Sequence, residues 1–262
     1  MENWKKKMNI KGMDALRKHV PELQTREGLA LASSTLAAVF IVTSLFFILV
    51  DSRFSEWMPD GEIVILALGF LIMSRFFSQK KTYQQKYGDL AYRTAFARFN
   101  IPGLGIVFAS IVHLGYMFGV EIPNLWWKTI LVGLGWVIVI IGLSLWFRTV
   151  AVFGVDNLTM LYVYFPAESQ MTDSRIYQIL RHPIYAAALG IGVGLAMIHA
   201  NWYALLVALI LPIFLIGWVR LVEEKDLLER FPDYANYRKR VPAFWPRPRD
   251  YVGFFHFLIL GG

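Results

Sequence analysis

Two short polar clusters in the last third of the sequence carry residue types that bind charged ligands. The first is Arg181-His182-Pro183, which stands directly before a run of small apolar residues and is followed by Tyr185. Proline suits the first turn of a helix, where its missing N–H costs nothing, so a helix is predicted to begin at Pro183, with His182 and Tyr185 on one face. The helix N-terminus, with Arg181 and His182, could hold a carboxylate. The alternative is that Arg181 anchors the chain at a membrane surface and His182 is a satisfied interfacial residue.

The second cluster is a pair of acids, Glu223 and Glu224. Acids are unusual at the end of a helix, because the helix dipole there favours cations. One carboxylate could therefore face inward and bind a cationic or hydroxyl-bearing group of a ligand. The alternative is a solvated helix end, paired with Arg220 or Lys225.

Both clusters adjoin long apolar blocks, and these blocks determine the fold class. Of the 262 residues, 56% are hydrophobic and 17% are charged, whereas about 25% of the residues in soluble domains are charged. A membrane-spanning helix needs about 20 mostly apolar residues. We therefore predict an all-α, polytopic membrane bundle of about six transmembrane helices. The blocks are Leu29–Val50, Ile63–Phe77, Ile101–Ile122, Leu125–Phe147, Ile184–Ala200 and Trp202–Val222.

The basic residues indicate the orientation of this bundle. Segments on alternate sides of the predicted spans hold 24 and 2 of the 26 Lys and Arg residues, and basic residues gather on the cytoplasmic side. A multi-pass integral membrane protein with both termini in the cytoplasm is expected. The net charge of +7 is explained by loops that face anionic headgroups, so membrane lipids are expected partners and nucleic acid is not. The absence of cysteine excludes disulfides, thiolate catalysis and cysteine-based metal sites.

The fifth and sixth blocks are predicted to form a tight helical hairpin, because only the turn "HAN" at 199–201 separates them. Ala186, Gly190 and Gly194 recur every four residues on one face of the fifth block, a spacing that lets helix backbones approach closely in lipid. The hairpin returns the chain to the side where it entered. Both polar clusters are therefore expected on one membrane face, where they would hold a cofactor.

Two ionisable residues stand in or beside other blocks. Arg148 follows the fourth block, and could either anchor the chain at the interface or point inward and hold a substrate carboxylate. His113 lies inside the third block, where a buried neutral histidine bonded to a neighbouring helix is expected.

The chain divides by character into four parts. They are a basic N-terminal cytoplasmic segment (1–28), a four-span membrane region (29–147), a core with the hairpin (148–250) and an apolar C-terminal tail (251–262) that is too short to cross a membrane.

Taken together, the motifs from about Arg148 to Pro246 resemble the integral-membrane methyltransferases of the isoprenylcysteine carboxyl methyltransferase and phospholipid methyltransferase superfamily. The pattern there is R-H-P-x-Y at the start of a hairpin, E-E at its exit, Y-x-x-Y and a basic V-P…P tail. This sequence supplies each part in that order: Arg181 to Tyr185, Glu223-Glu224, Tyr234 to Tyr237, and Val241-Pro242 with Pro246. The stretch "WFRTVAVFGVDN" is similar to the family's substrate-side segment, through Arg148 and Asn157.

The resemblance implies S-adenosylmethionine at the cytoplasmic mouth of the hairpin, a lipophilic substrate that enters from the bilayer, and no metal. It makes Arg148 and Glu224 the candidate catalytic residues and Arg148 and Asn157 the candidate substrate contacts. The candidate cofactor contacts are Arg181, His182, Pro183, Tyr185, Glu223, Glu224 and Tyr237.

Arg148 favours carboxyl O-methylation of an isoprenylcysteine-like or lipidated acceptor, because a carboxylate acceptor needs a cation to orient it. An amine acceptor would instead need a glutamate or water to take its proton. Phospholipid amine N-methylation and small-thiol S-methylation are the alternatives within the class. Outside it, a sterol-type reductase that uses NADPH and a non-catalytic membrane protein stay open.

Overall fold

The computed structural model describes residues 10–123, 126–172 and 174–261, and these residues form helices without any strand. A bridge between Glu121 and Asn201 is isolated. The predicted all-α class is confirmed for this part of the chain. The long helices are α2 (Arg26–Phe54), α3 (Met58–Ser78), α6 (Ile101–His113), α7 (Trp126–Phe153), α11 (Pro183–His199) and α12 (Trp202–Trp218).

Short helices connect and cover the long ones. They are α1 (Met13–His19), α4 (Lys80–Tyr87), α5 (Ala91–Ala95), α8 (Val155–Leu158), α9 (Leu161–Tyr164), α10 (Arg175–Ile179), α13 (Glu224–Arg230), α14 (Tyr234–Arg240) and α15 (Tyr251–Leu260). Single 3₁₀ turns occupy η1 (Pro21–Gln24), η2 (Ser55–Trp57), η3 (Gly88–Leu90), η5 (Pro166–Glu168) and η7 (Pro248–Asp250), and π-helical turns occupy η4 (Phe96–Asn100) and η6 (Val219–Glu223).

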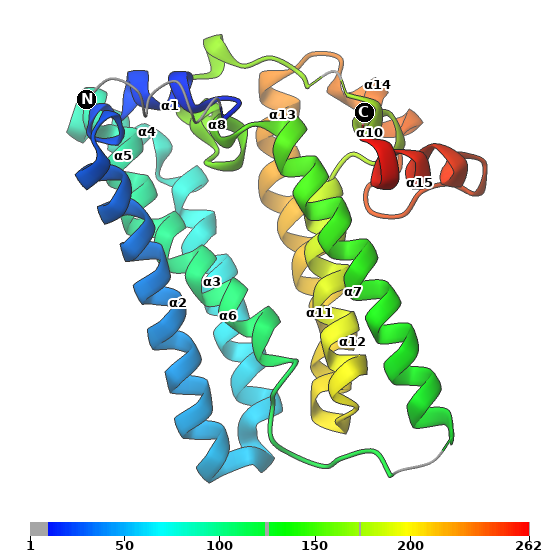
Figure 1. The fold of residues 1–262 in the computed structure, drawn as a ribbon. Coiled ribbons are helices and arrows are strands. Elements are labelled where there is room, and N and C mark those ends of the chain that lie inside the picture. The colour runs from blue at the N-terminus through cyan, green and yellow to red at the C-terminus, as the bar shows by residue number, and fades with distance from the viewer. Residues whose placement is uncertain (1–9, 124–125, 173, 262) are drawn as a thin grey trace.

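Four helical stretches among the described residues are long and apolar enough to cross a membrane: Arg26–Ser78, Lys80–His113, Trp126–Phe153 and Trp202–Arg230. The first contains α2 and α3, which run in opposite directions on either side of η2 (Figure 1). Pro183–His199 is a shorter apolar helix.

The third apolar block, predicted to be helical to Ile122, departs from helix after His113. The prediction was wrong beyond that residue. Asp51 Oδ2 accepts the backbone N–H of Phe118 at 2.5 Å, and Gly119 has a φ of 144° that favours glycine. The segment is thereby held as a loop against the end of α2.

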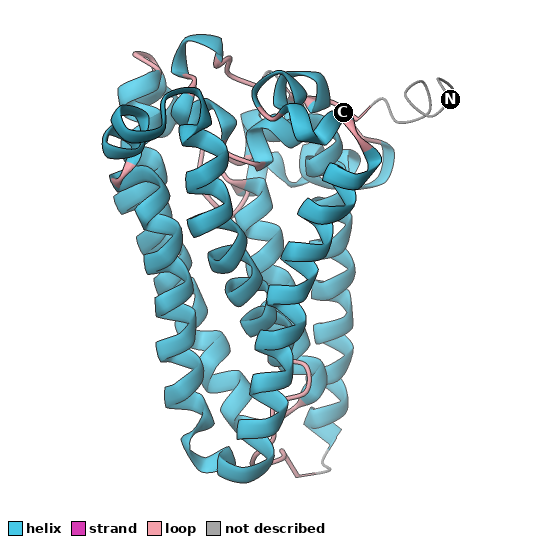
Figure 2. Ribbon diagram, turned by 90° about the vertical axis from the view of Figure 1, so that its left-hand side faces the viewer, coloured by secondary structure: helices cyan, strands magenta, loops and turns pink. Residues whose placement is uncertain are grey.

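The long helices form two groups, α2, α3 and α6 on one side and α7, α11 and α12 on the other (Figures 1 and 2). Helices α7 and α11 pack most closely. A Cβ built on Gly194 would lie 2.6 Å from Val139 Cγ2 and 2.9 Å from the Gly135 carbonyl oxygen, whereas one on Gly190 would find nothing nearer than 3.8 Å. Among the small residues predicted on this face of α11, Gly194 is therefore the position where the backbones of α7 and α11 lie too close for a side chain.

The hairpin of α11 and α12 has clear local causes. Pro183 occupies the start of α11, and Ala200 ends it with a φ of 53°. The side chain of Asn201 then caps α12 by accepting the N–H groups of Tyr203 at 2.8 Å and Ala204 at 3.3 Å. Such caps fix where a helix begins, so the turn is set by the sequence at 199–201.

The short helices gather at one end of the bundle, together with both described ends of the chain (Figure 1). Lys18 and His19 at the end of α1 bind Glu168 at 2.8 and 3.1 Å. The apolar tail α15 packs on α7 and α10, with Phe254 and Phe257 buried. This end therefore forms a polar cap over the apolar helices.

Candidate functional site

The segment that leads into α11 is hydrogen-bonded through its backbone to the chain that follows α14. The backbone N–H groups of Arg181 and His182 donate to the carbonyls of Pro242 and Ala243 at 2.9 and 3.0 Å. Both side chains are therefore held from two directions, by the start of α11 and by this pairing. The basic tail is thus part of the site rather than a loose surface patch.

Glu224 lies at the centre of a buried ionic network. Its Oε1 accepts Nε and Nη2 of Arg181 at 3.1 and 2.8 Å, and it lies 3.1 Å from His182 Nε2 and 3.4 Å from the Tyr234 hydroxyl. Its Oε2 lies 3.4 Å from Arg238 Nε. The carboxylate is 1% exposed, and a buried charge with so many cationic partners holds the surrounding elements together.

Arg181 is fully engaged within the protein. Besides Glu224, its Nη1 binds the carbonyl of Arg238 at 2.8 Å and the carbonyl of Val241. Its guanidinium is therefore committed to positioning the segment, although the residue also lines the cavity described next.

A cavity of about 670 Å³ opens beside this network, a volume typical of sites for small molecules. One part of its wall is polar and comes from α10, the start of α11, η6, α13 and α14. The other part is apolar and comes from the long helices α3, α6 and α7, including Phe70, Val107 and Trp146. The cavity therefore joins the polar cap to the apolar interior of the bundle.

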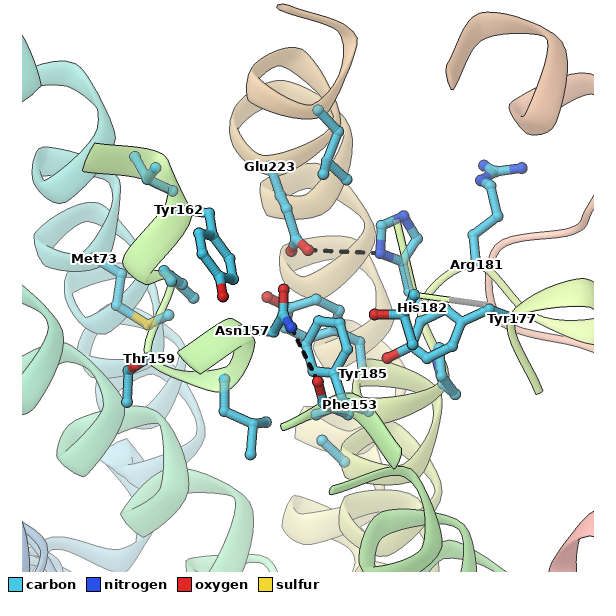
Figure 3. A pocket seen from close by; sticks show the side chains of 18 of the residues that line it. Met73, Phe153, Asn157, Thr159, Tyr162, Tyr177, Arg181, His182, Tyr185 and Glu223 are labelled. Atoms are coloured by element: carbon cyan, nitrogen blue, oxygen red, sulfur yellow. Dashed lines mark hydrogen bonds and ion pairs between the residues drawn. The ribbon is translucent and has the colours of Figure 1, made fainter. Parts of the chain in front are cut away.

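Glu223, next to the buried Glu224, faces this cavity (Figure 3). Its Oε1 lies 3.8 Å from His182 Nδ1, and its buried Oε2 has no hydrogen-bond partner in the described structure. Ser174 Oγ, which also borders the cavity, is likewise buried without one. Buried polar atoms normally have partners, so these two atoms mark where a ligand's donors would bind.

Aromatic rings enclose the polar part. His182 lies against Tyr185 and Phe244, with ring centroids 5.9 and 5.8 Å away. The Tyr237 hydroxyl donates to the Tyr177 carbonyl at 2.5 Å. Burial raises the pKa of Tyr237 to about 12, although Arg181 opposes the shift. Tyr237 is therefore a neutral donor near pH 7.

The structure brings most of the predicted site residues to one cavity, including both ends of the hairpin. Those that line it are Asn157, Arg181, His182, Pro183, Tyr185, Glu223 and Tyr237. Glu224 is not among the lining residues, because its carboxylate is turned into the ionic network. The Asn157 side chain donates to the Phe153 carbonyl at 2.9 Å (Figure 3).

Arg148 does not reach the cavity. Its Nη2 donates to the carbonyl of Ile259 in α15 at 2.6 Å, and it is absent from the cavity wall. The guanidinium thus takes the outward orientation that the sequence left as the alternative, and its role in holding a substrate carboxylate stays a prediction. The reason is tertiary: α15 folds back onto the end of α7 and takes up the guanidinium.

Several lining residues were not found from the sequence. Arg230 binds Asp226 at 2.6 Å and Ser169 at 3.0 Å, and it faces the cavity with Tyr162 and Tyr177. No spacing marks Tyr162, because it lies in the four-residue helix α9, which is too short to show a periodic pattern. Arg230 stood seven residues beyond Glu223, two helical turns along the same face, so it could have been found.

A second buried polar cluster lies at the other end of the bundle. His113 Nδ1 is 2.7 Å from Glu62 Oε2, and its Nε2 is 3.2 Å from Asp51 Oδ2. All three side chains are fully buried. As expected, His113 is bonded to neighbouring helices, here α2 and α3. No group of three or more His, Asp or Glu suited to a metal ion occurs in the described ranges.

The described residues form a helical bundle with four stretches apolar enough to cross a membrane and a cavity at one end. Comparison with known families places it more closely: residues 129–233 match the phospholipid methyltransferase family. The match covers less than half of the chain, and it agrees with the superfamily that the sequence motifs resemble.

Among curated proteins, the cobalt-zinc-cadmium resistance protein CzcN of Cupriavidus metallidurans is 32% identical over 113 residues, which are 40% of this chain and 51% of that protein. The chain thus spans about half the length of this relative. No solved structure matches the present chain.

Proposed function

We propose that the protein is an S-adenosylmethionine-dependent methyltransferase that acts on a lipophilic acceptor from the bilayer. The observation that carries the proposal is Glu223, a buried carboxylate with an unpaired oxygen, beside His182 in a cavity whose polar wall comes largely from the family-matched stretch. The family consists of methyltransferases, so methyl transfer is the activity of the class.

The residues present fit S-adenosylmethionine. Glu223 can accept ribose hydroxyl or amino donors, Arg230 can face a carboxylate, and the rings of Tyr177 and Tyr185 can pack on adenine or a sulfonium. When bound, the group supplies a methyl carbon that is already activated as an electrophile. The protein then needs only to align the acceptor, exclude water and remove any proton that the acceptor loses.

The apolar part of the cavity supports a lipophilic acceptor. It lies between α3, α6 and α7, where an apolar chain would contact Phe70, Val107 and Trp146. Carboxyl O-methylation, favoured by Arg148 in the sequence, loses that support, because the Arg148 guanidinium binds the Ile259 carbonyl in α15 instead of facing the cavity. N-methylation of a lipid amine and S-methylation of a thiol do not depend on Arg148, so both stay open.

We further propose six membrane crossings, by α2, α3, the Lys80–His113 stretch, α7, α11 and α12. The polar cap with its cavity would then face the cytoplasm, as would both termini, because the segments that the sequence predicts on that side of the spans hold 24 of the 26 basic residues and basic residues gather on the cytoplasmic side.

A binding assay tests the proposal. The melting temperature of the detergent-solubilised protein should rise with S-adenosylhomocysteine and stay unchanged with NADPH. A rise with NADPH alone would establish the reductase alternative. No rise with either would indicate a non-catalytic protein.

A further inference from the structure

Tyr162 and Asp156 form a hydrogen-bonded pair at the cavity wall that the proposed cofactor contacts do not use. Tyr162 lines the cavity, and its hydroxyl donates to Asp156 Oδ2 at 2.5 Å. In Figure 3 this hydroxyl is turned toward Asn157, within the region that Glu223 also faces. Because its single proton is given to Asp156, the Tyr162 oxygen can act only as an acceptor toward a ligand.

Asp156 is tightly enclosed beside Tyr162. It is 8% exposed, and a Cβ built on Gly12 or Gly154 would lie 1.8 or 2.5 Å from its Oδ1. Both glycines have positive φ, 82° and 94°, so they suit this backbone as well as this space. The N-terminal segment and the end of α7 thus close around the carboxylate.

The carboxylate is also short of partners. Its Oδ1 has no hydrogen-bond partner within the described part of the chain, and an ionised buried carboxylate with an unpaired oxygen is costly. Burial, followed by the hydrogen bond to Asp156, raises the pKa of Tyr162, so the tyrosine keeps its proton at neutral pH.

We propose that the pair Tyr162–Asp156 accepts the proton that the acceptor molecule loses during methyl transfer. The inference rests on the proposed function and narrows it. The acceptor is then an amine, thiol or hydroxyl at the end of an apolar tail, and not a carboxylate, which has no proton to lose.

The atoms and charges of this step balance. The nucleophile bonds to the methyl carbon, and the bond from that carbon to the sulfonium sulfur breaks with its electron pair left on sulfur. The nucleophile's proton passes to the Tyr162 oxygen, and the Tyr162 proton passes to Asp156 Oδ2. The positive sulfonium and the negative carboxylate both become neutral. Tyr162 is the residue that touches the acceptor, and Asp156 acts through it.

The product distinguishes the acceptor classes. Solubilised protein would be incubated with S-adenosylmethionine labelled in its methyl group and with total membrane lipid, and the labelled lipid would then be treated with mild alkali. Methyl esters release labelled methanol, whereas N-, S- and O-methyl products of amines, thiols and hydroxyls do not. We expect no labelled methanol, because the methyl group stays bonded to nitrogen, sulfur or an ether oxygen. Release of methanol would overturn this inference but leave the methyltransferase intact. The proposed function itself fails only if no label is transferred and S-adenosylhomocysteine does not stabilise the protein.

Variants test the two residues directly. Tyr162→Phe and Asp156→Asn should each lower turnover about 100-fold or more, because a proton acceptor contributes roughly 10²- to 10⁴-fold. The double variant should be no slower than Tyr162→Phe alone, since residues of one relay act as a unit. The rise in melting temperature with S-adenosylhomocysteine should be unchanged in all three.

Tyr92→Phe is the matched control. Its hydroxyl donates to the Thr159 carbonyl of the same connection at 3.0 Å, but Tyr92 does not line the cavity. It should retain turnover within about threefold, well below the 10²-fold effect of a lost proton acceptor. Wild-type turnover in Tyr162→Phe would refute the inference, as would equal losses in Tyr92→Phe and Tyr162→Phe, which would show that only the packing of the loop matters.

Discussion

Glu223 and Glu224 are adjacent and chemically identical, yet the structure gives them opposite roles. The test is the same substitution at both positions, Glu→Gln, which keeps the shape and removes the charge. In Glu224→Gln, the Arg181 guanidinium, only 10% exposed, loses its buried anion. Breaking a buried pair costs about 3–5 kcal/mol. We expect the lower end, because Arg181 keeps the carbonyls of Arg238 and Val241.

A loss of about 3 kcal/mol corresponds to a drop of roughly 6–12 °C in melting temperature for a chain of this size. Glu223→Gln should not show this drop. Its Oε1 lies 3.8 Å from His182 Nδ1, too far for a hydrogen bond, and its Oε2 has no hydrogen-bond partner among the described residues. Glu223→Gln should instead weaken ligand binding, because a charge-assisted hydrogen bond contributes about 1.5–3 kcal/mol, or roughly 10- to 150-fold in affinity.

The assay is thermal unfolding of both variants in detergent, with and without S-adenosylhomocysteine. Glu224→Gln is expected to melt early, and Glu223→Gln to melt normally but to bind the ligand weakly. If Glu223→Gln melts early while Glu224→Gln does not, the assignment of the inward and buried carboxylates is reversed and the reasoning fails.

Three further predictions follow from particular contacts. Arg148→Ala should leave S-adenosylhomocysteine binding and methyl transfer within about twofold of the wild type. Its guanidinium contacts Ile259, and contacts of this surface type contribute about 1 kcal/mol or less. A hundredfold loss of turnover would restore the predicted substrate role of Arg148. Gly194→Ala should destabilise the protein by about 1–3 kcal/mol through overpacking against Val139. Gly190→Ala, where there is room for a methyl group, should melt like the wild type. Equal melting temperatures of the two variants would show that α7 and α11 can move apart without cost. Hydrogen bonds from Lys18 and His19 lower the pKa of Glu168 from its usual 4.5, so its stabilising effect is fully present above pH 4.5 and is lost as the pH falls through the lowered pKa. Melting curves between pH 6 and 3 should therefore show a small acid-dependent loss that Glu168→Gln lacks, and identical pH profiles would contradict the pairing.

The sequence by itself determined the helical class, most of the long helices and the meeting of the two polar clusters. These follow from local causes. Apolar runs of sufficient length form helices in lipid, Pro183 starts one and Asn201 caps the next. A hairpin with a three-residue turn must return the chain to the side where it entered. His182 and Glu223 therefore had to lie at the same end of the bundle.

Only the tertiary structure decided which side chains face the cavity. Neighbouring residues on a helix point about 100° apart, so the choice between Glu223 and Glu224 depends on how the π-helical turn at Val219–Glu223 sits against α11. The local sequence does not determine whether Arg148 points inward or outward, and its contact with the Ile259 carbonyl of α15 decides it. The Tyr162–Asp156 pair needs Gly12, a residue more than 140 positions away, to enclose the carboxylate. Such contacts depend on packing between distant segments, and no local pattern in the chain encodes them.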